Sequence, residues 1–171
     1  MSAPPGAVVF VTGLPSSGKS TLAGRLVARL RHAGLPSVLL DGDEVRAALV
    51  PPPGYAPAER DAFYATLARL AALLARQGVL VAVAATANRR AHRAEARALA
   101  PRFVEVLVDV PAEECARRDA KGLWATARAG GAPELPGAGA PYERPERPDV
   151  VAVGGEDAVA VEAIVRLLGA A

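Results

Sequence analysis

The chain has 171 residues, of which 51% are apolar and only 4% are aromatic. This length suits one compact domain with an aliphatic core and is too short for two full catalytic domains, so we expect residues 1–171 to form a single domain. The 20 basic and 18 acidic residues give a formal net charge of +2, which argues against a nucleic-acid-binding surface.

Short apolar runs rich in β-branched residues alternate along the chain with longer segments of helical periodicity. We predict strands at 7–12, 37–41, 79–85, 103–110 and 149–153, and helices at 18–32, 57–77, 89–99, 112–129 and 156–168. Most of the strands are almost continuously apolar, as in parallel sheets that are covered on both faces. The alternation therefore predicts an α/β fold, a three-layer α/β/α sandwich around a five-stranded parallel sheet.

Two segments rich in proline and glycine interrupt this alternation, VPPPGYAP at 50–57 and AGGAPELPGAGAPYERPERP at 129–148. They follow the second and fourth predicted strands. Ligands of open α/β sheets bind outside the carboxyl ends of the strands, so these segments lie where a ligand would be covered. We predict that both cover the substrate and that the second belongs to a lid.

The stretch GLPSSGKS, residues 13–20, fits the pattern G-x-x-x-x-G-K-[ST] between a predicted strand and a predicted helix. Glycines let the backbone curl so that consecutive N–H groups converge on a polyphosphate, next to the positive N-terminal end of the helix. Lys19 can reach the β- and γ-phosphates of ATP, and the Ser20 hydroxyl can bind Mg²⁺. The predicted nucleotide-binding residues of this P-loop are Gly13, Ser16, Ser17, Gly18, Lys19, Ser20 and Thr21.

A phosphate loop alone does not distinguish a switch, a motor and a kinase. A GTPase would carry an N-K-x-D motif, which the chain lacks. A motor would have a long apolar strand that ends in acidic residues, whereas the third predicted strand runs into AATANRR. The sequence therefore favours a small-molecule kinase that uses ATP and Mg²⁺.

Polar residues also follow the second predicted strand, in LLDGDEVRAAL at 39–49. Asp41 and Asp43 emerge at the carboxyl edge of the sheet, and Arg46 follows about one helical turn after Gly42. A carboxylate there can orient Mg²⁺ or accept the proton of an attacking hydroxyl, while Arg46 can hold an anionic group of the acceptor. The alternative is a helix N-cap, which for Asp43 is compatible with a catalytic role.

Membrane, secretory and thiol-based functions are not indicated. The N-terminal MSAPPGAVVFVTG has no basic stretch before a long apolar run, as a signal peptide would, and no stretch reaches the roughly 18 apolar residues of a membrane span. Cys115 is the only cysteine, which excludes an intramolecular disulfide and a cysteine-rich zinc site. We expect a cytoplasmic protein in which Cys115 is a half-buried helix residue.

Several motifs together resemble one kinase family. The segments GLPSSGKSTLA, LLDGDEVR, GYAPAERDAF, CARRDAKGLWATARAG and PGAGAPYERPERPD, in this order, are similar to those of adenylylsulfate (APS) kinase. That family phosphorylates the 3′-hydroxyl of adenosine 5′-phosphosulfate with Mg-ATP and yields PAPS in sulfate assimilation. The elements DGDxxR and RDxKGLxxxAR are more diagnostic than a phosphate loop.

The resemblance implies roles for the acceptor side. Asp41 would be the metal-linked or proton-accepting carboxylate, and Asp43 and Arg46 would contact the acceptor. Arg60 would meet the phosphosulfate group. Tyr55 takes the place of a family phenylalanine that stacks on the acceptor adenine.

The resemblance also implies a lid over about 117–148, whose basic residues Arg118 and Lys121 close over ATP. Positive charge there would neutralise the transferred oxygens in a site that excludes water. A small-molecule substrate and a homodimer are further implications, with no nucleic-acid or membrane partner.

Departures from the family concentrate on the acceptor half. Phe63, Tyr64, Ala65 and Thr66 stand where the family reads Asn-Ile-Arg-Arg, and Thr86-Ala87-Asn88 replaces Ile-Ser-Pro. Leu135 stands where a second aromatic ring would complete the sandwich around the acceptor adenine. These changes leave open a kinase of the same family that acts on a different hydroxylated metabolite.

Two further hypotheses concern loss of catalysis and a second set of basic residues. The chain could have lost catalysis and act as a nucleotide-binding regulatory protein, although Asp41, Arg46 and Lys121 argue against this. Arg89, Arg90 and Arg93, clustered after the third predicted strand, are candidates for replacement anion contacts, and the alternative is a solvated basic start of a helix.

Overall fold

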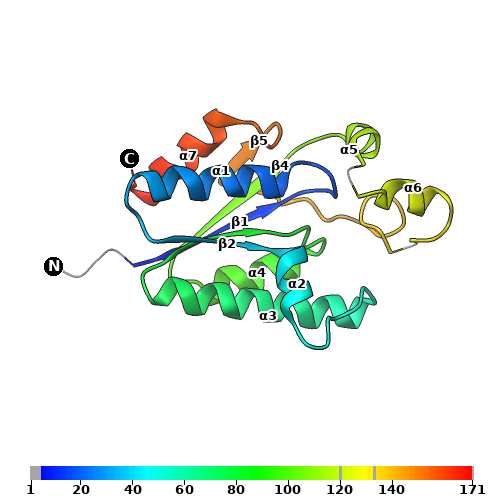
Figure 1. The fold of residues 1–171 in the computed structure, drawn as a ribbon, viewed down its shortest axis with the longest axis horizontal. Helices are drawn as coiled ribbons and strands as arrows, with labels where there is room; N and C mark the ends of the chain where they lie inside the picture. Colours follow the sequence, from blue (N-terminus) through cyan, green and yellow to red (C-terminus); the bar gives the residue numbers. More distant parts are fainter. Residues whose placement is uncertain (1–4, 120, 133, 171) are drawn as a thin grey trace.

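A sheet of five parallel strands lies between two layers of helices (Figure 1). The computed structural model describes residues 5–119, 121–132 and 134–170. The strand order is β2-β3-β1-β4-β5, which confirms the predicted fold class. The strands are β1 (Ala7–Thr12), β2 (Ser37–Asp41), β3 (Leu80–Ala84), β4 (Phe103–Val108) and β5 (Val150–Ala152).

The central strand β1 is buried along its whole length. It pairs with β3 on one side and β4 on the other, so that Val9 lies opposite both Ala82 and Val104. A strand that is covered on both faces has no solvent-facing positions, which explains its unbroken apolar sequence. The carboxyl end of β1 leads directly into the phosphate loop.

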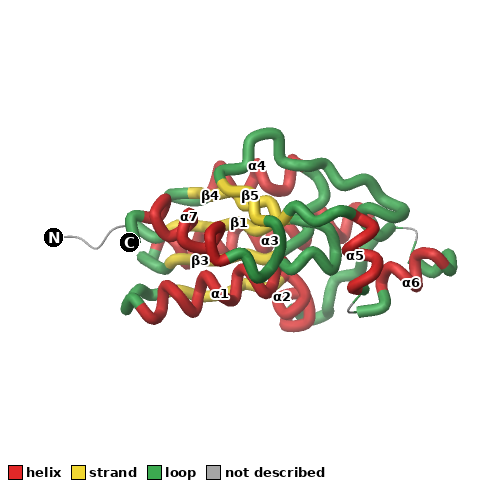
Figure 2. Tube along the Cα trace, turned by 90° about the horizontal axis from the view of Figure 1, so that it is seen from above, coloured by secondary structure: helices red, strands yellow, loops and turns green. Residues whose placement is uncertain are grey.

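Helices cover both faces of the sheet, α1 and α7 on one side and α3 and α4 on the other (Figure 1). Viewed from above, α5 and α6 lie beyond the end of the strands, away from the two termini (Figure 2). No helix in the described part of the chain is both long and apolar enough to cross a membrane. The helices are α1 (Lys19–His32), α2 (Gly42–Ala48), α3 (Pro57–Arg76), α4 (Arg90–Leu99), α5 (Ala112–Arg118), α6 (Leu123–Arg128) and α7 (Ala158–Leu168).

The helix predicted at 112–129 is wrong as a single helix, because it breaks into α5 and α6. Asp119 has φ 28° and Gly122 has φ 68°, values that an α-helix cannot contain. The carboxylate of Asp119 accepts hydrogen bonds from the backbone N–H groups of Trp124 and Ala125, at 2.8 and 2.9 Å, which starts α6 in a new direction. Two positions of the predicted lid, 120 and 133, lie outside the described residues.

The short helix α2 was not among the predicted helices and appeared only as an alternative for the residues after β2. Its N-cap is Asp41, whose Oδ1 accepts from the N–H of Asp43 at 3.0 Å. The suggestion that Asp43 is the cap is therefore wrong. Cys115 is also fully buried on α5 rather than half-buried, and burial raises the pKa of its thiol.

Candidate active site

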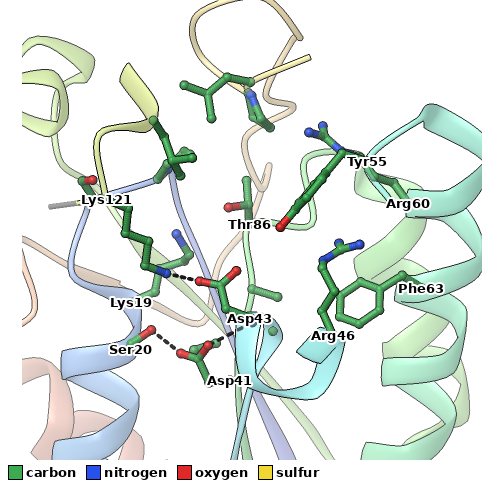
Figure 3. Close-up of a pocket in the computed structure, with 18 of the residues that line it drawn as sticks. Lys19, Ser20, Asp41, Asp43, Arg46, Tyr55, Arg60, Phe63, Thr86 and Lys121 are labelled. Carbon is green, nitrogen blue, oxygen red and sulfur yellow. Dashed lines mark hydrogen bonds and ion pairs between the residues drawn. The ribbon is translucent and has the colours of Figure 1, made fainter. Parts of the chain in front are cut away.

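A cavity of about 500 Å³ opens at the carboxyl end of the sheet (Figure 3). Its walls come from the phosphate loop, α2, the start of α3, the loop after β3 and the segment around α6. This volume lies in the range of small-molecule sites. The predicted site residues that line it are Ser16, Gly18, Lys19, Ser20, Thr21, Asp41, Asp43, Arg46, Tyr55, Arg60, Lys121 and Leu135.

Three predicted site residues do not line this cavity. Gly13 and Ser17 are buried residues of the phosphate loop, and the backbone N–H of Ser17 donates to the carbonyl of Leu14. Arg118 lies on α5, and its Nε donates to Glu114 at 3.1 Å on an exposed face of that helix. Its predicted contact with ATP stays a prediction.

The shape of the phosphate loop depends on its two glycines. Gly18 has φ 102°, and a Cβ there would lie 2.6 Å from the backbone nitrogen of Gly155. A Cβ on Gly13 would lie 2.8 Å from the carbonyl oxygen of Val108. Both positions therefore exclude any side chain, for reasons of backbone conformation or space.

Lys19, the first residue of α1, places its ammonium group within the phosphate loop. Its Nζ donates to the carbonyl of Leu14 at 2.8 Å. Burial lowers the pKa of Lys19 from 10.5 to about 8, although the carboxylate of Asp43 acts in the opposite direction. A partly desolvated cation beside the N-terminus of a helix favours an anionic ligand such as a polyphosphate.

The hydroxyl of Ser20 donates a hydrogen bond to Oδ2 of Asp41, which joins the phosphate loop to the end of β2 (Figure 3). Asp41 is 8% exposed and holds the start of α2 with its other carboxylate oxygen. One hydroxyl and one carboxylate side by side are oxygen ligands suited to Mg²⁺, which takes its remaining ligands from phosphates and water. Among the described residues, no group of three or more His, Cys, Asp and Glu could hold a metal ion.

The segment around α6 contacts both sides of the cavity. Lys121 forms an ion pair with Asp43 of α2 (Figure 3), and this hydrogen bond raises the pKa of Lys121. Trp124 is buried, and its Nε1 donates to the carbonyl of Pro15 in the phosphate loop at 3.1 Å. Sequence reasoning missed this residue, although it is the only tryptophan in the chain.

Arg46 lies between two aromatic rings at the far side of the cavity (Figure 3). Its guanidinium carbon is 4.3 Å from the ring centroid of Tyr55 and 4.0 Å from that of Phe63. Its Nη1 donates to the carbonyls of Gly54 and Pro53, at 2.7 and 3.2 Å. The sequence identified Phe63 only as a departure from the family, and the structure places it in the wall of the cavity.

Some of the other departures from the family pattern also lie in the wall of the cavity, and others do not. Leu135, Tyr64 and Thr86 also line the cavity, whereas Ala65 and Ala87 do not. On the acceptor side of the cavity, Phe63 therefore replaces an amide with an apolar ring, while Tyr64 and Thr86 replace isoleucines and add hydroxyl groups.

The arginines that follow β3 are not anion contacts in this cavity, so that hypothesis is wrong. Arg89 pairs with Asp61 at 3.1 Å. The backbone N–H of Arg90 donates to the Glu143 carboxylate, and Arg93 donates from a buried position to the Glu143 carbonyl. Arg90 and Arg93 therefore anchor the last part of the predicted lid, whereas Arg89 contacts α3.

Comparisons with known proteins agree with this geometry. The sequence profile of a family described as adenylylsulphate kinase matches residues 5–153, a range that contains every residue of the cavity. The adenylyl-sulfate kinase of Synechococcus sp. (strain JA-2-3B'a(2-13)) is 42% identical over 154 residues, which are 90% of this chain and 88% of that relative.

Solved structures show the same similarity. The APS kinase of Mycobacterium tuberculosis, in complex with AMPPNP and APS, matches with a TM-score of 0.88 and 37% identity, over 97% of this chain and 99% of its own. A hexameric APS kinase from Thiobacillus denitrificans matches with a TM-score of 0.68 and 29% identity, over 97% of this chain and 29% of its own.

Proposed function

Because the chain belongs to the adenylylsulphate kinase family, we propose that it transfers the γ-phosphoryl group of ATP to the 3′-hydroxyl of APS and forms PAPS. The observation that carries this proposal is that one cavity brings the two sets of residues together. Lys19 and Ser20 of the phosphate loop line one side of it, and Asp41, Asp43 and Arg46 line the other, at the carboxyl end of the sheet. In this proposal residues 1–171 form one kinase domain.

ATP occupies the phosphate-loop side of the cavity in this proposal. Backbone N–H groups of the phosphate loop and the N-terminus of α1 receive the phosphates, with Lys19 on the β- and γ-phosphates and Thr21 near the α-phosphate. Lys121 and Arg118 add positive charge from the lid side. These residues orient the γ-phosphoryl group toward the end of β2.

Ser20 and Asp41 would hold Mg²⁺, Asp41 either directly or through water, because their oxygens are already hydrogen-bonded to each other on the cavity wall. When bound, the ion neutralises charge on the β- and γ-phosphate oxygens. The protein contributes the placement of the two oxygens, which the fixed start of α2 provides.

APS occupies the other side of the cavity. Arg46 and Arg60 would contact its anionic groups, and Tyr55 and Leu135 would flank its adenine. The 3′-oxygen attacks the γ-phosphorus while the bond from that phosphorus to the β,γ-bridging oxygen breaks, so that ADP leaves. The proton of the 3′-hydroxyl goes to a carboxylate, for which Asp41 is the buried candidate and Asp43 the exposed one.

A second candidate function is a kinase of the same family with a different hydroxylated acceptor. It is favoured by Phe63, Leu135 and Thr86, which present apolar or hydroxyl groups where the family places an amide, an aromatic ring and an isoleucine. A homodimer stays a prediction of the family resemblance, and a cytoplasmic location also stays a prediction.

The test is product formation by the purified protein with radiolabelled γ-phosphate in ATP, Mg²⁺ and APS. We expect label in the 3′-position of the nucleotide product, and Lys19→Ala serves as the control without phosphate-loop charge. Wild-type labelling no higher than that control would refute APS as the acceptor. ATP consumption with other hydroxylated metabolites would then identify the alternative.

A further inference from the structure

We propose that Phe63 is a positioning residue, which holds the guanidinium of Arg46 so that its free edge faces the anionic group of the acceptor. This inference rests on the proposed function, and it assigns a role to a side chain that the family pattern does not contain at this position. Arg46 belongs to α2 and Phe63 to α3, so the contact joins two elements of the acceptor side.

The guanidinium of Arg46 is fixed from three directions. The ring centroid of Phe63 lies 4.0 Å from the guanidinium carbon, and that of Tyr55 lies 4.3 Å from it (Figure 3). In the plane of the group, Nη1 donates to two backbone carbonyls of 53–54. A planar cation that contacts two aromatic rings and donates two hydrogen bonds from one nitrogen cannot rotate without breaking these contacts.

The edge formed by Nη2 and Nε is what remains for a ligand. Among the residues that the structure describes, both hydrogen bonds of this guanidinium leave from Nη1, and no ion pair involves Arg46. The side chain is only 8% exposed and lines the cavity. A buried arginine without a carboxylate partner favours binding of an anion from the cavity.

Aromatic rings can hold the Arg46 guanidinium in place without neutralising its charge, which an ion pair would do. A carboxylate beside Arg46 would hold the guanidinium but would also neutralise it, and the acceptor's anion would have to compete for the same N–H groups. An aromatic face attracts the cation without supplying a hydrogen-bond acceptor in the plane of the group. Arg46 is thus held in place while its charge stays available.

The two rings have different parts in this arrangement. Phe63 is 3% exposed and packs in the core between α3 and the sheet, so its position is fixed by the fold. Tyr55 is 56% exposed and lies in the loop before α3, so it can move to admit the acceptor. Phe63 is therefore the side of the stack that sets the position of Arg46.

The kinetic test compares Phe63→Leu with Phe10→Leu. Phe10 is 2% exposed in the same core cluster, but it has no arginine stacked on its ring in the described structure, so it reports the effect of losing a buried ring alone. For Phe63→Leu we expect the KM for APS to rise about 2- to 30-fold, with kcat and the KM for ATP changed less than twofold. Phe10→Leu should leave all three unchanged, and Phe63→Tyr, which keeps a ring face, should restore the wild-type KM.

A double-mutant cycle with Arg46→Met shows whether Phe63 acts through the arginine. The Phe63→Leu change should add nothing to the KM for APS once Arg46 is absent. An effect of equal size in both backgrounds, or an equal rise in Phe10→Leu, would overturn the inference.

A spectroscopic measurement separates failure of this inference from failure of the proposed function. In the ¹⁵N-labelled wild type, the Nε–Hε signal of Arg46 should be shifted upfield by the two neighbouring rings and should exchange slowly with water. Phe63→Leu should move it toward the value of a solvated arginine. A solvated signal in the wild type would overturn the positioning role whether or not APS is the acceptor, and absence of APS turnover with a shifted signal would refute only the acceptor.

Discussion

Raising the pH from 7 to 9 should weaken nucleotide binding, because the lysine of the phosphate loop loses its proton in that range. Burial lowers the pKa of Lys19 from 10.5 to about 8, and bound phosphate requires the charged form. The protonated fraction falls from about 0.9 at pH 7 to about 0.1 at pH 9 for such a group. The affinity for ADP should therefore fall up to about tenfold, or about 1.4 kcal/mol.

Isothermal titration calorimetry with ADP and Mg²⁺, in buffers of different ionisation enthalpy, measures both the affinity and the protons taken up. We expect uptake of about 0.5 proton at pH 8 and about 0.9 at pH 9 as the bound phosphate restores the charge of Lys19. Lys19→Met should abolish this uptake. Lys121→Met is the matched control, because the pKa of Lys121 is raised and this lysine stays charged throughout.

In the ligand-free protein, the lowered pKa of Lys19 makes the free energy of unfolding depend on pH. Because the folded pKa of Lys19 lies below its unfolded value, the unfolded chain binds more protons between pH 8 and 10.5, and the contribution of Lys19 to stability rises with pH in that window. The difference in free energy of unfolding between wild type and Lys19→Met should follow this slope. A constant ADP affinity from pH 7 to 9, with no proton uptake, would refute the whole line of reasoning.

Three substitutions test other parts of the site. Gly18→Ala places a Cβ 2.6 Å from Gly155 at φ 102°, so ADP binding by calorimetry should be lost, and unchanged affinity would contradict the steric argument. Asp41→Asn keeps a good N-cap but removes the charge, so thermal melting should change little while kcat falls about 100-fold or more; a large loss of stability with intact kcat would contradict its chemical role. Lys121→Met breaks an exposed ion pair with Asp43, so the free energy of unfolding by urea should change by less than about 1 kcal/mol. The kcat of this variant should fall about 100-fold, and a normal kcat would exclude Lys121 from catalysis.

The local pattern of apolar residues in the sequence predicted most of the helices and strands. The strand β1 is buried on both faces, which leaves an unbroken apolar run in the sequence, and α1 repeats its apolar residues at helical spacing. The break between α5 and α6 could not be predicted in the same way, because RRDAKGLWA consists mostly of residues that favour helices. The break depends on the carboxylate of Asp119 reaching forward to two backbone N–H groups, and Gly122 was its only local sign.

In the candidate site, too, the residues identified by a local motif were predicted, and those that depend on tertiary packing were not. The glycines and Lys19 of the phosphate loop, and Asp41 after β2, follow directly from the bonding that phosphates and metal ions need. The stack of Phe63 on Arg46 depends on how α2 lies against α3, which spacing along the chain does not reveal. The mistaken hypothesis for Arg93 has the same origin, since its partner Glu143 comes from a segment 50 residues further along the chain.

A crystal structure with AMPPNP, Mg²⁺ and APS bound together would test the two-sided cavity most directly. We predict the γ-phosphoryl group within hydrogen-bond distance of Lys19 Nζ, and the 3′-oxygen of APS directed at it, with an anionic group of APS on the free edge of Arg46. A triphosphate outside the phosphate loop, or APS bound away from Arg46, would contradict the assignment of donor and acceptor sides.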